Sequence, residues 1–139
     1  MHRAILWLFV LNTFSSVFGQ CAPINIALEK PYTLEPAPNY PACTEAGDRT
    51  QLTDGKKVSD LFWTQPGCVG WSGQSPVVIT IDLQTNQPIA GVSFNTAAAA
   101  ASGVGWPSEL YVWVSDDGDL WHVTGDLVAL SAKHSLPPS

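Results

Sequence analysis

Apolar and polar residues alternate most regularly near the end of the chain, over residues 110–115. An acidic Asp-Asp-Gly turn at 116–118 interrupts the alternation, and a second apolar segment covers 120–123. Alternating residues on both sides of an Asp-Gly pair are typical of two antiparallel strands joined by a tight turn. The pattern therefore predicts a β-hairpin, and we expect its tryptophans, Trp113 and Trp121, to lie in the core.

Three further segments are expected as strands. The clearest is Val77–Leu83, whose apolar side chains recur at every second position and so share one face of a strand. A turn containing Pro88 separates it from the next expected strand, Ile89–Asn95, and a short strand is expected at Asn25–Leu28. Short strands without a long amphipathic helix predict an all-β protein.

Two other segments are expected to lack regular structure. Residues 32–43 hold three prolines and follow Pro31, so we expect an extended, irregular segment instead of a central strand. Residues 97–101 are five consecutive alanines followed by Ser-Gly. Alanine favours a helical turn, but the run is short and lacks larger apolar residues, which favours a loop between two strands.

The N-terminus has the layout of a secretory signal peptide. A short, weakly basic start precedes an apolar run at 4–11, and small residues lead up to Gly19. The apolar run is much shorter than the roughly 20 residues that span a bilayer, which disfavours the alternative of a membrane anchor. We therefore expect cleavage after Gly19, a secreted protein without a membrane span, and a mature domain over residues 20–139.

Composition and charge narrow the class of partner. Charged residues make up 13% of the chain, and 11 glycines and 11 prolines interrupt it often, as in a compact β protein. Without Arg3 the mature chain keeps five basic and twelve acidic residues, a formal charge of −7. An acidic surface argues against nucleic acid and anionic membranes as partners. It is compatible with neutral sugars and with bound cations.

Three cysteines remain after the expected cleavage, namely Cys21, Cys43 and Cys68. Export makes disulfides feasible, and the odd number leaves one cysteine over. We favour a Cys43–Cys68 disulfide, because both residues lie in turn-rich segments that would meet at one end of a sandwich. Closing that interval would stabilise the fold by roughly 3 kcal/mol. Metal binding by the thiols is disfavoured, since no C-x-x-C spacing occurs.

No pattern of residues predicts catalysis. The mature chain has two histidines, His122 and His134, and lacks G-x-S-x-G, H-E-x-x-H and paired-carboxylate spacings. We therefore expect a protein that is not an enzyme.

Asp54, in Thr-Asp-Gly-Lys-Lys, is the best candidate for a metal ligand. Calcium prefers carboxylate and carbonyl oxygens in a tight loop, and Ser59 or Asp60 could add an oxygen. The alternative is an ordinary turn in which Asp54 accepts hydrogen bonds from its own backbone. The neighbouring lysines, Lys56 and Lys57, weaken the calcium prediction unless they point away. The acidic residues at 116–119 are expected to form a solvated hairpin tip.

Loop aromatics are the candidate ligand-binding residues. An exposed indole offers a large flat surface on which a sugar ring can stack. Trp71 and Trp106 lie beside glycines in expected loops, and Tyr40 lies in the proline-rich segment. Each could instead close one end of the sandwich as a structural side chain.

The order of these segments resembles the discoidin domain, also called the coagulation-factor type C or galactose-binding-like domain. The resemblance spans residues 23–130 and rests on Asn25–Ala27, Lys30–Pro31, Leu52–Gly55, Trp63, Trp71, Val78–Leu83, Pro107, Val112–Gly118 and Trp121. It implies a jelly-roll β-sandwich of roughly eight strands, a structural calcium near Asp54, and loops at one end that bind sugars, phospholipid headgroups or proteins. The family's closing C-terminal strands have no counterpart here, so the resemblance implies an incomplete domain.

Together these observations predict a secreted, non-catalytic binding module. Its expected ligand is a carbohydrate or glycoconjugate at a cell surface or in the extracellular matrix. The alternative is a structural or interaction module attached to a larger extracellular enzyme or adhesin, such as a downstream catalytic domain.

Overall fold

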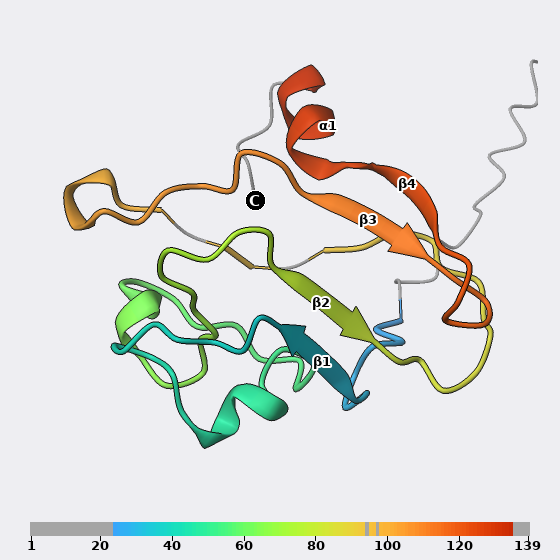
Figure 1. Cartoon of the computed structure of the whole chain (residues 1–139), viewed down its shortest axis with the longest axis horizontal. Coiled ribbons are helices and arrows are strands. Elements are labelled where there is room, and N and C mark those ends of the chain that lie inside the picture. Colours follow the sequence, from blue (N-terminus) through green and yellow to red (C-terminus); the bar gives the residue numbers. More distant parts are fainter. Residues whose placement is uncertain (1–23, 94, 97, 135–139) are drawn as a thin grey trace, which may run out of the picture.

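The computed structural model describes residues 24–93, 95–96 and 98–134. Its strands form two separate antiparallel pairs, and one short helix follows the last strand (Figure 1). The prediction of a β-rich fold of short antiparallel strands is confirmed at this coarse level. The expected signal peptide, residues 1–19, lies outside the described residues. In the part of the chain that is described, no helix has the length and apolar character needed to cross a bilayer.

The first pair consists of β1 (Tyr32–Glu35) and β2 (Val78–Ile81), in which Tyr32 faces Ile81 and Glu35 faces Val78. β2 lies inside the expected strand. The expectation that the proline-rich segment is irregular throughout was wrong for β1. Its prolines flank the four strand residues without interrupting them, so the strand keeps its backbone donors at the edge of a small sheet.

The second pair is the predicted hairpin, made of β3 (Tyr111–Val114) and β4 (His122–Asp126). The register shifts between Val112 and Trp113, which marks a β-bulge or a similar irregularity. Asp126 ends β4 and caps the helix α1 (Leu127–Lys133), accepting hydrogen bonds of 3.0 Å from the amides of Val128 and Leu110. One carboxylate thus joins the hairpin to the helix that follows it.

Two expected strands are absent. Residues 26–29 form turns in place of the strand expected at Asn25–Leu28, and residues 89–93 and 95 pair with no other strand. Residues 89–93 and 95 are exposed, and Ile26 and Ala27 of the first segment are only half-buried, so neither segment has a buried face to hold a register. The described part of the alanine run, residues 98–101, lies in a loop, as expected, which holds the 3₁₀ turn η3 (Ala100–Ser102) and is closed by a bridge between Ala99 and Val104.

The most closely packed part of the described chain is where residues 40–54 meet residues 67–71. Its buried residues are Cys43, Cys68, Asp48 and Thr53, each at most 9% exposed. No large side chain of the described residues is fully buried. The short helices η1 (Ala46–Arg49) and η2 (Phe62–Thr64) belong to this half of the molecule.

The expectation that Trp113 and Trp121 lie in the core was wrong. Trp113 is 54% exposed and Trp121 is 40% exposed. A strand pair has two faces, and each described sheet has only two strands. Alternation therefore correctly predicted a strand at β3 but not the burial of its apolar side chains.

Candidate functional site

An open groove of about 270 Å³ lies between β1, the proline-rich segment that follows it, and η1. One wall is mainly apolar and the other is polar. The lining residues are Tyr32, Leu34, Ala37, Pro38, Thr44, Glu45, Asp48 and Arg49. A concave surface that combines an apolar wall with a few polar groups is the usual form of a small-molecule site.

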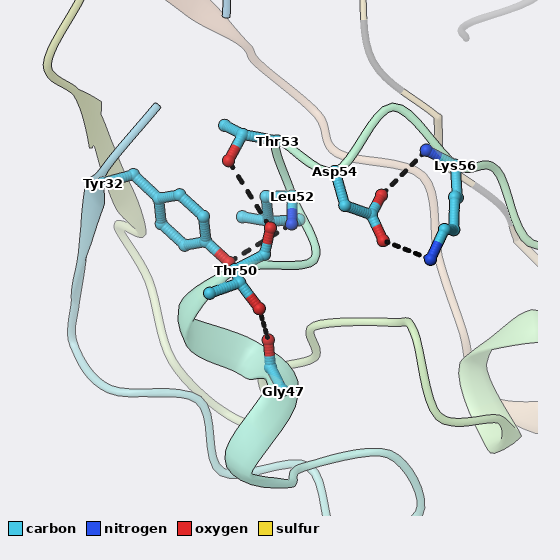
Figure 2. Close-up of polar contacts among 7 residues, drawn as sticks. All are labelled: Tyr32, Gly47, Thr50, Leu52, Thr53, Asp54 and Lys56. Atoms are coloured by element: carbon cyan, nitrogen blue, oxygen red, sulfur yellow. Dashed lines mark hydrogen bonds and ion pairs between the residues drawn. The ribbon is translucent and has the colours of Figure 1, made fainter. Parts of the chain in front are cut away.

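Tyr32 is held rigidly at the boundary between the two walls. Its hydroxyl donates a hydrogen bond of 2.7 Å to the carbonyl of Asp48 and accepts one of 3.2 Å from the amide of Leu52. Figure 2 shows the ring reaching from β1 toward the loop that follows η1. Burial raises the pKa of Tyr32, and the charges of Asp48 and Asp54 act in the same direction. Tyr32 is therefore a fixed, neutral part of the groove.

Asp48 forms the buried floor on the polar side. Its side chain accepts 2.7 Å from the Gln51 amide group and 3.3 Å from the backbone amide of Glu45. Burial raises the pKa of Asp48, and the nearby charge of Glu45 raises it further, while these two hydrogen bonds act against the shift. Because its oxygens are engaged within the protein, Asp48 acts as a structural residue of the groove.

The groups of the polar wall that remain for a ligand are Thr44 and Arg49. Both residues are exposed. Among the described residues the Arg49 guanidinium makes no ion pair, and the Thr44 hydroxyl makes no hydrogen bond. Glu45 is also exposed at this wall. The Glu45 carboxylate caps η1 by accepting from the backbone amide of Asp48, so the wall offers a ligand one cation with several donors and one hydroxyl.

The apolar wall is positioned by contacts with residues 70–72. The indole Nε1 of Trp71 donates 2.8 Å to the carbonyl of Pro36, and the carbonyl of Gly70 accepts from the amides of Asn39 and Tyr40 at 3.1 Å. The Asn39 side chain also bonds both backbone groups of Ser72, at 2.7 and 3.1 Å. These bonds fix both ends of the Ala-Pro pair that lines the groove.

The three predicted ligand-binding residues lie in two different parts of the structure, and none of them lines the groove. Trp71 and Tyr40 belong to the two segments that these bonds join, Trp71 through its indole and Tyr40 through its backbone amide. They do not line the groove. Trp106 lies in the loop before β3, is 45% exposed, and does not line the groove either. The alternative reading of loop aromatics as structural side chains describes Trp71 well.

In the predicted calcium loop, Asp54 interacts with Lys56. Asp54 accepts a hydrogen bond of 2.8 Å from the amide of Lys56, and the Lys56 ammonium lies 3.9 Å from the other carboxylate oxygen (Figure 2). Asp60 is exposed, with its side chain 3.4 Å from the Ser59 hydroxyl. The described residues hold no group of three His, Cys, Asp or Glu side chains placed to bind a metal. Calcium at Asp54 and Asp60 stays a prediction.

Cys43 and Cys68, the predicted disulfide, are both buried and both free thiols in this structure. Burial raises the pKa of the Cys43 thiol. Burial and the neighbouring Cys43 raise the pKa of Cys68 to about 11. The structure thus brings the two residues together, while the covalent bond between them stays a prediction.

Sequence reasoning missed the groove residues Tyr32, Glu45 and Arg49. A usable signal was the acidic pair three positions apart at Glu45 and Asp48, a spacing typical of the first turn of a short helix. Comparison of the whole chain with protein-family models, curated proteins and solved structures finds no match. The groove therefore has to be interpreted from its own chemistry.

Proposed function

We propose that this chain is a secreted, non-catalytic binding module whose groove holds a carbohydrate. The observation that carries the proposal is an apolar wall facing Arg49 and Thr44 across one open groove. Among the described residues the Arg49 guanidinium makes no ion pair and the Thr44 hydroxyl makes no hydrogen bond. A sugar ring has the matching character, because it presents C–H groups on its faces and hydroxyls at its edge. Guanidinium and carboxylate groups form bidentate hydrogen bonds with neighbouring hydroxyls.

The volume of the groove and the hydrogen bonds of Asp48 support a small ligand that binds without undergoing a reaction. Its volume of about 270 Å³ lies just below the range of roughly 300–1,000 Å³ typical of sites for drug-sized ligands. One sugar ring, with part of a second, is a ligand of suitable size. Asp48 is occupied by Gln51 and by the Glu45 amide, which leaves one carboxylate at the polar wall instead of a pair poised for acid–base chemistry.

The resemblance to discoidin domains extends the proposal to the fold. The two antiparallel pairs, β1–β2 and β3–β4, would be parts of a jelly-roll sandwich whose remaining strands have no counterpart among the described residues. A structural calcium at Asp54 and secretion through the N-terminal signal belong to the same proposal.

A second candidate function is an interaction module attached to a larger extracellular protein. The exposed apolar side chains of both sheets favour it, among them Val78, Ile79, Tyr111 and Trp113, each between 44% and 54% exposed. Exposed apolar side chains, where they gather into a patch, mark sites that contact another chain.

A glycan array probed with the exported chain tests the carbohydrate proposal. Arg49→Ala should weaken binding by about tenfold or more, since a hydrogen bond to a charged group contributes roughly 1.5–3 kcal/mol. Ala37→Trp should block the groove by filling it. Lys57→Ala is the matched control, because it removes an exposed cation that does not line the groove. Absence of glycan binding, or equal losses in Arg49→Ala and Lys57→Ala, would exclude the groove as a sugar site.

A further inference from the structure

The two buried cysteines lie where the supports of both groove walls meet. Cys43 directly precedes Thr44 of the polar wall, and its backbone amide donates 3.2 Å to the carbonyl of Tyr40. On the other side, the carbonyl of Cys68 accepts 3.1 Å from the same Gln51 amide group that holds Asp48. Cys43 is thus next to a groove residue in the chain, and Cys68 is connected to another groove residue through the side chain of Gln51.

Packing between the two segments is tight at this point. A Cβ at Gly70 would lie 2.9 Å from the Sγ of Cys43 and 2.9 Å from the Cβ of Tyr40. The Cys43 thiol therefore lies directly against the backbone two residues after Cys68. Both thiols are shielded from solvent, at 5% and 9% exposure.

We propose that Cys43 and Cys68 form a disulfide that locks the apolar wall against residues 68–72 and so keeps the groove open for its ligand. The disulfide and the rigidity that it gives the junction do not depend on any ligand. Its effect on affinity, in contrast, rests on the proposed carbohydrate function. In place of two independent segments held by hydrogen bonds, the groove would be framed by one covalently closed loop.

The bond forms by thiol–disulfide exchange with a low-molecular-weight disulfide, the oxidant that an export compartment supplies. One cysteine thiolate attacks a sulfur of that disulfide and releases one small thiolate. The second cysteine thiolate then attacks the protein sulfur of the mixed disulfide and releases the other. Two protein thiols become one disulfide, the small disulfide becomes two thiols, and the two protons pass to the released thiolates. Because both thiols are buried in the folded state, this exchange takes place during folding, while the thiols are still accessible.

Amide hydrogen exchange on one chain in two redox states tests the proposal. A Cys21→Ser background leaves two cysteines in the mature protein, which is prepared with oxidised glutathione and then compared before and after reduction. Alkylation of the oxidised chain under denaturing conditions, followed by mass spectrometry, should find no free thiol. Reduction should then speed exchange of the Asn39 and Tyr40 amides by at least about tenfold, because these amides bond Gly70 across the locked junction.

Two results would overturn the proposal. One is alkylation of both thiols when the oxidised chain is denatured before labelling, and the other is unchanged exchange of the two amides upon reduction. The exposed hairpin amide of Asp119, bonded within its own turn, serves as the internal control and should exchange alike in both states. These readouts need no sugar. Loss of glycan binding with an intact redox response would therefore refute the proposed function and leave the disulfide standing.

Discussion

The Nε1 of Trp71 donates a hydrogen bond of 2.8 Å to the carbonyl of Pro36, a residue 35 positions earlier in the chain. Proline has no amide hydrogen, so its carbonyl is the one backbone group that it can contribute. The bond ties the end of β1 to residues 70–72 and makes Trp71 a support of the groove.

Trp71→Phe should therefore lower stability and also weaken the groove. The phenyl ring keeps much of the packing but loses the donor, which should reduce the free energy of unfolding by about 1 kcal/mol. Urea unfolding of the purified chain measures this change. Trp106→Phe is the matched control, because Trp106 is 45% exposed and its indole has no hydrogen-bond partner in the described part of the chain. Equal losses in the two variants would contradict a structural role specific to Trp71.

Gly70→Ala should destabilise the junction by roughly 1–3 kcal/mol, the usual cost of overpacking a closely packed site. The added methyl group would meet the Sγ of Cys43 and the Cβ of Tyr40, each at 2.9 Å. Gly91→Ala is the control, since a Cβ there meets nothing within 4 Å. Thermal unfolding of both variants compares them directly, and a loss in Gly91→Ala as large as that in Gly70→Ala would show that packing at the junction is not the cause.

The raised pKa of Asp48 predicts that part of the chain's stability is lost as pH rises. Its folded-state pKa is raised above the ordinary value, so the folded chain holds this proton more tightly than the unfolded chain does. The stability that it contributes is fully present below the unfolded pKa of roughly 3.9 and is lost as pH rises through the folded value.

Denaturant unfolding of the wild type and of Asp48→Asn, from about pH 3.5 to pH 7, isolates this contribution. The wild type minus variant difference in unfolding free energy should fall as pH rises. A difference that grows with pH would mean that the carboxylate is favoured in its ionised form, contrary to the structure.

The predicted calcium site gives a fourth test. If calcium binds at Asp54, the melting temperature should be higher with calcium than with chelator, and Asp54→Ala should abolish the difference. Lys56→Ala should enlarge it, because the ammonium 3.9 Å from the carboxylate competes with a cation. Identical melting curves with calcium and with chelator in the wild type and in Lys56→Ala would remove the metal from the proposal.

How far the sequence predicted this structure depends on the kind of contact. The hairpin over β3 and β4 could be predicted because its turn and its alternation are local. β1 could not be predicted in the same way, because its partner, β2, lies more than forty residues away and its flanking prolines suggested irregularity. Pairing between strands that lie so far apart in the chain produces no recurring pattern in the local sequence.

The candidate site shows the same division. The Asp54 turn could be foreseen because an Asx turn is set by neighbouring residues. The groove could not be foreseen, because it needs Tyr32 bonded to Asp48 and Trp71 bonded to Pro36, two links between distant segments. The exposure of Trp113 could not be predicted either. Alternation shows which face of a strand a side chain lies on, but not whether another part of the protein covers that face.

The pairing of β2 with one described neighbour has a consequence for how the protein behaves at high concentration. Its residues, Val78–Ile81, are β-branched and uncharged, and among the described residues its second edge carries no partner strand. Such an edge can template cross-chain pairing and the growth of insoluble assemblies. The acidic net charge of −6 opposes this through mutual repulsion, so colloidal stability should decline as salt screens that charge or as pH approaches 4.7.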